Sequence, residues 1–387
     1  MYKILTLNNI SSKGLEKFPR KNYEISSEVN NPDAILLRSF KMHDYEIPET
    51  VKAVGRAGAG VNNIPIDKLS AKGIPVFNTP GANANAVAEL VLAAMLIGSR
   101  NICQGWDFAN KLEGTDAEIS KAVESGKKNF VGMELPGKTL GVVGLGAIGV
   151  KVANNAMALG MNVIGYDPVL TVERALELSS GITKTSSIDE LLTNSDYISF
   201  HVPLNDNTKG LLNSDRLKRM KDNLVIMNFA RGGIVDDDAI LAGLKDGKVY
   251  SYICDFPSNK LKTNPRVIAL PHLGASTEEA EENCALMVGE QIRDFLENGN
   301  IRNSVNFPEV FMARGEGHRI SIANSNVPNM VGQISSELGK KGINIIDMLN
   351  RSMKEYAYTL LDVDQDISDD VINHLKGING VLAVRKH

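Results

Sequence analysis

Two side chains in this 387-residue sequence are of types that bind a carboxylate and exchange a proton, and each follows an apolar run. Arg231 comes shortly after Leu224–Asn228, and His272 comes shortly after Val267–Leu270. An arginine fork is permanently charged and binds a carboxylate in two places. Histidine exchanges a proton near neutral pH, as a general base must. A lone histidine after a strand is more often structural, but its convergence with Arg231 and a cofactor loop favours catalysis.

That cofactor loop is predicted from a glycine pattern with its flanking elements. An apolar strand, Thr139–Val143, runs into Gly144, Gly146 and Gly149, which have the spacing G-x-G-x-x-G before a helix. The glycines allow a tight turn, close approach of a pyrophosphate and close packing of helix on strand. Asp167 follows Gly144 by 23 residues, where a carboxylate accepts ribose hydroxyls and repels a 2′-phosphate. The pattern predicts NAD binding in preference to NADP, whereas a plain glycine-rich turn leaves Asp167 unexplained.

Further strands and helices alternate on both sides of this loop, which predicts an α/β fold. Short strands ahead of it indicate a smaller α/β domain with two notable loops, one carrying Arg38 and Ser39 and one glycine-rich loop carrying Arg56. Backbone N–H groups beside an arginine suit a carboxylate or a phosphate. The alternative is a plain turn with surface arginines. Residues 106–132 are expected to form a helix and a loop, and 176–178 are expected to be helical.

From residue 319 the pattern restarts as β-α-β-β-α-β, which predicts a ferredoxin-like unit. The formal charge of −4 gives no general attraction to nucleic acid or anionic membranes. Three distant cysteines suggest neither a disulfide framework nor a metal site. No signal peptide or membrane span is apparent, so we expect a cytoplasmic protein.

Six motifs in order, GRAGAGVNN, NTPGANANAVAEL, LGVVGLGAIG, HVPL, NFARGGIVD and PHLGAST, resemble the D-2-hydroxyacid dehydrogenase family. The likeness covers essentially the whole chain and is strongest to the branch that acts on phosphoglycerate. It implies a Rossmann-type doubly wound sheet inserted in a smaller flavodoxin-like domain, with a C-terminal ACT regulatory domain. The implied bounds are 1–98 with 274–306 for substrate binding, 99–273 for NAD binding and 317–387 for the ACT domain.

The resemblance also implies roles for individual residues. Arg231 anchors the substrate, His272 is the acid and base, and the family dimerises through its cofactor domain, which implies a homodimer or homotetramer. Implied cofactor contacts are Gly144, Gly146, Ala147, Ile148, Gly149, Asp167, His201, Val202, Pro203, Thr208, Ala230, Asp255 and Gly274. Implied substrate contacts are Arg38, Ser39, Arg56, Ala57, Gly58, Ala59, Gly60 and Asn83, together with Arg231 and His272.

Two departures from the family pattern affect these expectations. The family usually carries a glutamate that pairs with the catalytic histidine, and Lys260 falls at its place. Because Arg231 and His272 are intact, we expect activity to persist with a changed pH profile. In the ACT unit, Asn326 and Asn344 match effector contacts, whereas Asn324 replaces a histidine. Side-chain amides still suit an amino acid, so serine is a candidate effector; the alternative is a packing role only.

The expected reaction is the NAD-dependent oxidation of 3-phospho-D-glycerate to 3-phosphohydroxypyruvate, the first step of L-serine biosynthesis. One alternative is another D-2-hydroxyacid dehydrogenase, for glycerate or 2-hydroxyglutarate. The other is a non-catalytic NAD-sensing protein, against which the retention of both Arg231 and His272 argues.

Overall fold

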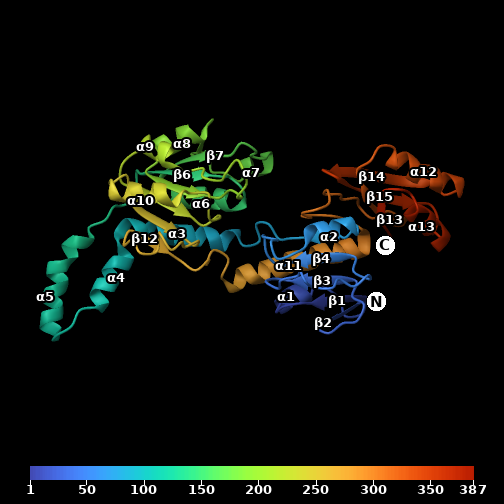
Figure 1. The fold of residues 1–387 in the computed structure, drawn as a ribbon, viewed down its shortest axis with the longest axis horizontal. Coiled ribbons are helices and arrows are strands. Elements are labelled where there is room, and N and C mark those ends of the chain that lie inside the picture. The colour runs from blue at the N-terminus through green and yellow to red at the C-terminus, as the bar shows by residue number, and fades with distance from the viewer. The chain divides into compact units, whose positions relative to one another are not determined.

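The computed structural model describes residues 1–387, which divide into two compact units. Unit 1 consists of Met1–Asn83 and Glu278–His387, and unit 2 consists of Ala84–Thr277. The chain therefore leaves unit 1, completes unit 2 and returns (Figure 1). The finer division into three domains at residues 98, 273 and 306 stays a prediction.

Unit 2 contains a seven-stranded parallel sheet in the order β12-β11-β10-β9-β6-β7-β8. The order reverses beside β6, as in a Rossmann-type sheet, so the predicted fold is confirmed and ligands are expected at this reversal. The strands are short and mostly buried, because helices cover both faces. They are β6 (Thr139–Val143), β7 (Asn162–Tyr166), β8 (Thr183–Lys184), β9 (Tyr197–Phe200), β10 (Leu224–Asn228), β11 (Val249–Cys254) and β12 (Val267–Ala269).

The helices of unit 2 begin mostly at polar capping residues. Ser187 accepts the backbone N–H of Glu190 at the start of α8, and Asp236 accepts two backbone N–H groups at the start of α10. The helices of the sheet region are α3 (Ala84–Arg100), α6 (Ala147–Ala158), α7 (Val172–Leu176), α8 (Ile188–Asn194), α9 (Ser214–Lys218) and α10 (Asp237–Lys245).

A helical arm projects from the sheet of unit 2 (Figure 1). It consists of α4 (Ile102–Asn110), α5 (Asp116–Gly126) and the short 3₁₀ helix η1 (Lys127–Phe130). The expectation of one helix and a loop over 106–132 is therefore wrong. The second helix forms because Thr115 and Glu118 build a reciprocal capping box at its start.

Unit 1 begins with a five-stranded parallel sheet in the flavodoxin-like order β2-β1-β3-β4-β5. The long helix α11 packs on this sheet and on α1. A Cβ added at Gly14 would lie 2.5 Å from Ala285, so the two helices touch through glycine. The elements are β1 (Tyr2–Thr6), β2 (Tyr23–Ser26), β3 (Ala34–Leu37), β4 (Ala53–Arg56), β5 (Val76–Phe77), α1 (Ser12–Leu15), α2 (Ile66–Ala71) and α11 (Glu278–Asn298).

The last part of unit 1 is an antiparallel sheet in the order β14-β15-β13-β16 with two helices. This confirms the β-α-β-β-α-β prediction and is compatible with an ACT-like unit. Its elements are β13 (His318–Ser325), α12 (Met330–Lys340), β14 (Ile345–Met353), β15 (Tyr356–Val363), α13 (Asp369–Lys376) and β16 (Val381–Lys386).

The ACT-like sheet shares a hydrophobic core with α11. Tyr358 and Leu360 on the sheet pack with Phe295 on the helix and with Phe307. Polar contacts reinforce the junction, because the Tyr358 hydroxyl donates to the backbone oxygen of Gly299 at 2.8 Å. The sheet is therefore integrated into unit 1 rather than tethered to it.

A buried ion pair stabilises the same junction. The guanidinium of Arg319 on β13 lies 2.6 Å from the carboxylate of Asp362 on β15, and the Arg319 side chain is fully buried. The same guanidinium donates to the backbone oxygens of Met312 and Ala313, in the segment that leads from α11 into the sheet. Every side of the charge is thereby hydrogen-bonded, which a buried ion requires.

One further local expectation needs correction. Of the helix expected over 176–178, only Leu176 is helical, as the last residue of α7. That helix begins at Val172, where the Thr171 hydroxyl accepts the N–H of Arg174. No single helix is both long and apolar enough to cross a bilayer. Helices α3 and α4 would pass that test only as a pair, and they are bent by 66°.

Candidate active site

The glycine-rich loop of unit 2 forms a bare backbone turn between β6 and α6. Gly144 has a φ of +93°, and a Cβ there would lie 2.6 Å from the backbone oxygen of His201. Gly149 approaches the backbone of Gly144 so closely that any Cβ would overlap it. Gly146 is the N-cap of α6, has open space around it and makes no side-chain capping bond. The first turn of α6, including Ala147 and Ile148, therefore presents backbone N–H groups to an incoming anion.

Asp167 is oriented toward this loop by two backbone donors. One carboxylate oxygen accepts the N–H of Leu145 at 2.8 Å, and the other accepts the N–H of Val169 at 2.9 Å. The carboxylate is thus fixed beside the glycine turn, and each of its oxygens keeps a further lone pair for a hydroxyl group.

His201 follows β9 at the opposite side of the same turn. Its Nε2 lies 2.8 Å from the Ser199 hydroxyl, and burial lowers the pKa of His201 to about 3. The His201 imidazole therefore stays neutral at physiological pH, with a proton on only one of its two ring nitrogens. Val202 contacts the Gly144 position, and the Thr208 hydroxyl donates to the backbone oxygen of Pro203.

Arg231 is exposed on the loop after β10, where a buried asparagine organises the backbone. Asn228 donates its amide to the backbone oxygen of Arg231 at 2.9 Å and accepts the N–H of Ala230 at 3.2 Å. The guanidinium of Arg231 donates to the backbone oxygen of Ala230 at 2.7 Å. Arg231 is exposed, and its other guanidinium N–H groups make no hydrogen bond in the structure, so they are available to a carboxylate.

His272 follows β12 in an unusual backbone conformation. Its φ is +50°, and its N–H donates to the backbone oxygens of Asp255 and Leu270, each at 3.1 Å. The imidazole is exposed and packs against the ring of Phe256, with the ring centroids 4.8 Å apart. No hydrogen bond forms at either ring nitrogen in the structure. Both nitrogens are thus open for proton exchange.

Asp255 is a buried carboxyl group with an unfilled acceptor. It is 1% exposed, and one oxygen accepts the N–H of Gly274 at 3.2 Å while the other has no partner. Burial raises its pKa, opposed by the Gly274 N–H and the nearby charges of His272 and Arg231. A buried oxygen without a partner is rare in native proteins and points to a donor supplied by a ligand. The carboxamide of a nicotinamide offers such a donor, so the residues present fit NAD.

Lys260 lies at the position where the sequence resemblance implies a glutamate, and its side chain is directed toward α10. Its ammonium lies 2.8 Å and 2.9 Å from the two carboxylate oxygens of Asp238 in the first turn of α10. That ion pair is exposed at the surface of unit 2.

The predicted substrate loops occupy the carboxyl ends of β3 and β4 in unit 1. Asn8 gathers the backbone N–H groups of Ser39 and Phe40 on one oxygen, at 3.1 Å and 2.6 Å. Arg56 donates to the backbone oxygens of Arg38 and Gly60, which curls the loop of Ala57, Gly58, Ala59 and Gly60 around its guanidinium. Asn83 is partly exposed at the last position of unit 1 before α3.

Arg38 is paired with a carboxylate of α11. Its guanidinium lies 2.6 Å from Glu281, and both side chains are partly exposed. Because the pair is accessible to water, an incoming anion competes with Glu281 at little cost.

The three predicted effector residues lie apart within one chain. Asn324 and Asn326 are at the end of β13 that pairs with Ala357 and Tyr356, whereas Asn344 precedes β14 beside Asp364 at the other end of the sheet. Asn324 is 1% exposed and its carbonyl oxygen has no partner.

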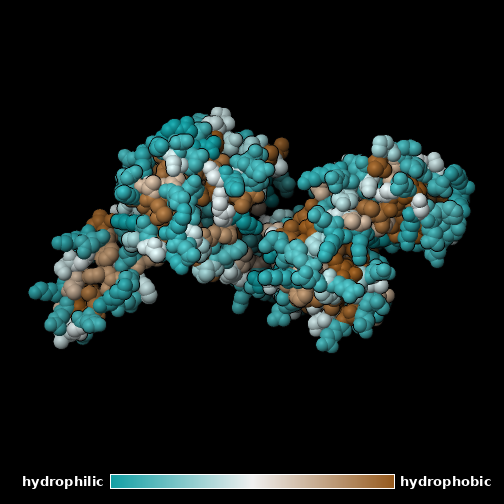
Figure 2. Space-filling model, in the orientation of Figure 1, coloured by the Kyte–Doolittle hydropathy of each residue, from teal (hydrophilic) through white to brown (hydrophobic).

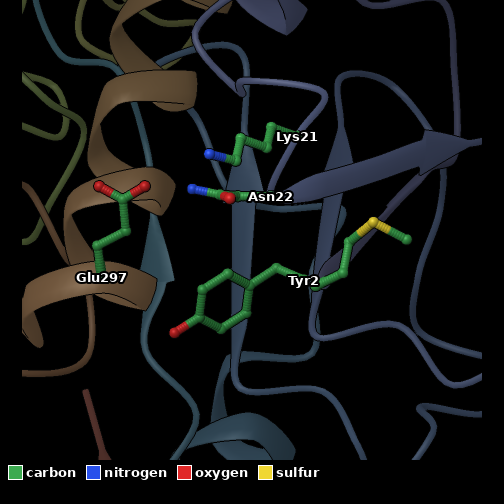
Figure 3. Close-up of a pocket in the computed structure, with 5 residues that line it drawn as sticks. Tyr2, Lys21, Asn22 and Glu297 are labelled. Carbon is green, nitrogen blue, oxygen red and sulfur yellow. The ribbon is translucent and has the colours of Figure 1, made fainter.

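A shallow pocket of about 300 Å³ lies elsewhere in unit 1, at the amino ends of β1 and β2. Figure 3 shows Tyr2, Lys21 and Asn22 facing the helix that carries Glu297. Glu297 is already bonded to the hydroxyl of Tyr23 and to Arg293. Since the predicted substrate loops follow the opposite, carboxyl ends of the strands, this pocket is separate from the candidate site.

Sequence reasoning missed three residues that support the candidate site: Asn8, Asn228 and Phe256. A signal existed for the two asparagines, because each ends or follows a strand directly before a turn, where Asn side chains bond to backbone. Phe256 carried no such signal, since its contact with His272 depends on which strands are neighbours.

Comparison with known proteins places this chain. The family described as "D-isomer specific 2-hydroxyacid dehydrogenase, NAD binding domain" matches residues 92–274. A D-3-phosphoglycerate dehydrogenase of Haemophilus influenzae is 34% identical over 378 residues, covering 94% of this chain and 88% of that protein. The chain belongs to the D-2-hydroxyacid dehydrogenase family. Its unit 2 contains the NAD-binding domain of that family.

Two further relatives set the limits of the likeness. A D-3-phosphoglycerate dehydrogenase of Methanocaldococcus jannaschii is 38% identical over 296 residues, covering 74% of this chain and 54% of that protein. The chain thus spans little more than half the length of that relative. The crystal structure of NAD⁺-bound 3-phosphoglycerate dehydrogenase from Entamoeba histolytica matches with a TM-score of 0.60 at 28% identity, covering 79% of this chain and 98% of that one.

Proposed function

We propose that this protein oxidises 3-phospho-D-glycerate to 3-phosphohydroxypyruvate with NAD, the first step of L-serine biosynthesis. The observation that carries the proposal is the placement of Arg231 and His272 on loops that follow β10 and β12 of the NAD-binding sheet. The likeness to the Haemophilus influenzae enzyme over 94% of the chain supports the choice of substrate.

In this proposal Arg231 and His272 divide the chemistry. NAD supplies the acceptor for the hydride from C2 of the substrate. Arg231 holds the substrate carboxylate with a fixed positive fork and stabilises charge on the forming carbonyl. His272 removes the proton of the C2 hydroxyl in oxidation and returns it in reduction. The open ring nitrogens of His272 support this role.

We assign cofactor binding to the surfaces around the glycine turn. The first turn of α6 binds the pyrophosphate, Asp167 binds the ribose hydroxyls, and Asp255 with Gly274 binds the nicotinamide amide. His201, Val202, Pro203, Thr208 and Ala230 border the same sheet edge and contact the rest of the cofactor. The unpaired oxygen of Asp255 is the strongest support for the nicotinamide end.

The phosphorylated end of the substrate is assigned to the loops of unit 1. Arg38, Ser39 and Arg56, with the 57–60 backbone and Asn83, supply positive charge and N–H donors. In this assignment the phosphate displaces Glu281 from Arg38. Residues 1–98 with 274–306 then form the substrate domain, 99–273 the NAD domain and 317–387 the regulatory domain.

Two partners belong to the proposal. The arm of unit 2 exposes Ile102, Trp106 and Val131, and Figure 2 shows hydrophobic residues on the visible face of the arm. A second copy of the chain covering this arm gives a homodimer or a dimer of dimers.

Serine is the proposed effector at Asn324, Asn326 and Asn344. Because these residues lie at opposite ends of one sheet, two chains must contribute them.

The test is NADH consumption by the purified protein with three keto acids. We expect 3-phosphohydroxypyruvate to be reduced with a kcat/KM at least 100-fold above that for hydroxypyruvate, which lacks only the phosphate, and for 2-oxoglutarate. Preference for another keto acid would overturn the choice of substrate but leave the proposed roles of Arg231 and His272 in place. Binding of NADH without turnover of any of them would instead favour an NAD sensor.

A pair of histidine variants tests the chemistry. His272→Ala should lower kcat by about 10²–10⁴-fold with NADH binding retained, as expected for loss of a general acid or base. His318→Ala, on the exposed start of β13, is the matched control and should behave as the unchanged protein. Near-full turnover in His272→Ala would remove the assignment.

A further inference from the structure

The orientation of His272 in this chain does not depend on a carboxylate. Lys260 occupies the position of the family's glutamate and is bonded to Asp238, and neither ring nitrogen of His272 is hydrogen-bonded. The Asp255 carboxylate bonds to the Gly274 N–H rather than to the imidazole. An acid and base catalyst with a free ring samples several orientations, and only some of them reach the substrate hydroxyl.

The backbone limits His272 only in part. Its φ of +50° lies in the left-handed region, which residues other than glycine adopt uncommonly. The two bonds of its N–H, to the backbone oxygens of Asp255 and Leu270, hold that conformation. These bonds fix where the side chain leaves the backbone, but they leave rotation about its own single bonds free.

Phe256 supplies the missing constraint. Its ring centroid is 4.8 Å from that of His272, a separation typical of paired aromatic rings, and the two ring planes are tilted by 48°. A Cβ placed at Gly232 would lie 3.5 Å from the Cβ of Phe256. Phe256 thus contacts His272 and lies close to Gly232, the residue that follows Arg231.

The sheet order explains this double contact. Phe256 comes two residues after β11, and β11 lies between β10 and β12 in the sheet. Since the carboxyl ends of parallel strands meet at one edge, a side chain after the middle strand reaches the loops of both neighbours. Phe256 therefore lies close to both the Arg231 loop and the His272 loop.

We propose that Phe256 is the positioning residue for His272, orienting the imidazole by ring packing where relatives with the glutamate use a carboxylate. The claim that Phe256 affects catalysis rests on the proposed function. The claim that Phe256 orients the imidazole rests on the ring contact. A packed ring constrains the direction of the His272 imidazole without adding charge. Phe256 touches neither cofactor nor substrate in this role.

Kinetics of matched variants test the catalytic part. Phe256→Leu should lower kcat with 3-phosphohydroxypyruvate about 10- to 100-fold, as expected for a misplaced catalytic group, with the KM and the Kd for NADH changed less than about twofold. Phe256→Tyr keeps the ring and should retain kcat within about threefold. Phe311→Leu, which removes a half-exposed ring against Arg302 in unit 1, is the control and should change nothing.

A spectroscopic readout tests the structural part without any substrate. In protein labelled at histidine, the ring Cε1–H signal of His272 is assigned by its loss in His272→Gln. That signal should move in Phe256→Leu, because the ring current of Phe256 is removed, and should stay in place in Phe311→Leu. An unmoved signal would overturn the proposal.

The two readouts separate the possible failures. If the unchanged protein reduces no keto acid, the proposed function fails, while the signal of His272 still decides whether Phe256 holds the ring. If the unchanged protein is active and Phe256→Leu keeps its full kcat, the positioning role is overturned even if the signal moves.

Discussion

Lys260 and Asp238 form a bidentate ion pair, with the ammonium 2.8 Å and 2.9 Å from the two carboxylate oxygens. Asp238 belongs to the first turn of α10, which also carries Asp237. Lys260 therefore neutralises part of the negative charge in the first turn of α10. The same negative charge directs the Lys260 side chain toward that helix.

The first prediction concerns a glutamate restored at this position. Lys260→Glu should leave the pH profile of keto-acid reduction unchanged, because the new carboxylate is repelled by Asp237 and Asp238 and is not drawn to His272. The melting temperature should fall slightly from the same repulsion. Lys260→Met, which removes the charge only, is the control. A shift in the pH profile specific to Lys260→Glu would mean that a side chain at position 260 reaches His272.

The second prediction concerns cofactor choice. Asp167→Asn removes the charge and one acceptor that the proposed function assigns to the ribose hydroxyls, so kcat/KM for NADH should fall by about 10- to 100-fold, the usual worth of hydrogen bonds to a charged group. The preference for NADH over NADPH should narrow, since the repulsion of a 2′-phosphate is lost. Asp215→Asn on the exposed start of α9 is a matched control. An unchanged NADH to NADPH ratio would place the ribose elsewhere.

The third prediction concerns the buried Arg319–Asp362 pair. Arg319→Met leaves the Asp362 carboxylate buried without a counter-charge, and breaking a buried pair in this way costs about 3–5 kcal/mol. The urea midpoint of unfolding should drop accordingly. The double variant Arg319→Met with Asp362→Leu should recover most of the loss, because two apolar side chains replace the pair. Equal losses in the single and double variants would show that the ion pair itself, rather than its burial, stabilises the junction.

The fourth prediction concerns pH and His387. Burial, chiefly, lowers the pKa of His387 to about 3, with smaller effects from the charges of Arg385, Lys52 and Arg314. Between that value and the ordinary 6.5, the unfolded chain binds a proton that the folded chain does not. Stability should therefore fall as the pH drops below 6.5, by at most about 1.4 kcal/mol per pH unit from this one group.

The measurement compares melting temperatures of the unchanged protein and His387→Gln from pH 7.5 to 4.5. The glutamine variant should lose less stability over this range, since it has no proton to gain at that site. Some pH dependence should remain in both proteins, because the pKa of buried His201 is lowered to about 3 as well. Parallel curves for the two proteins would contradict the assignment.

Local patterns predicted most of the elements that position the candidate site. Thr139–Val143 and Leu224–Asn228 have the predicted bounds, because each is a short apolar run that ends at a turn. The glycine spacing and Asp167 likewise predict the glycine-rich turn, because all of these residues lie close together in the sequence. The sequence also placed Arg231 and His272 on one sheet edge from the strand alternation alone.

Contacts between distant segments could not be predicted in this way. The packing of Phe256 on His272 requires β11 to lie between β10 and β12, and strand order is not encoded in local periodicity. The pairing of Lys260 with Asp238 depends on where α10 begins relative to the loop after β11. The sharing of one core by Tyr358 and Phe295 joins residues 63 positions apart in the chain.

That shared core has an evolutionary consequence. The face of the ACT-like sheet that carries Tyr358 and Leu360 covers Phe295 and Phe307, so deleting the sheet would expose a large apolar surface on the rest of unit 1. A lineage that lost all response to an effector could let Asn324 and Asn344 drift, yet selection for a folded α11 would keep the sheet. The ACT-like sheet should therefore be retained among descendants of this protein whether or not Asn324 and Asn344 bind an effector.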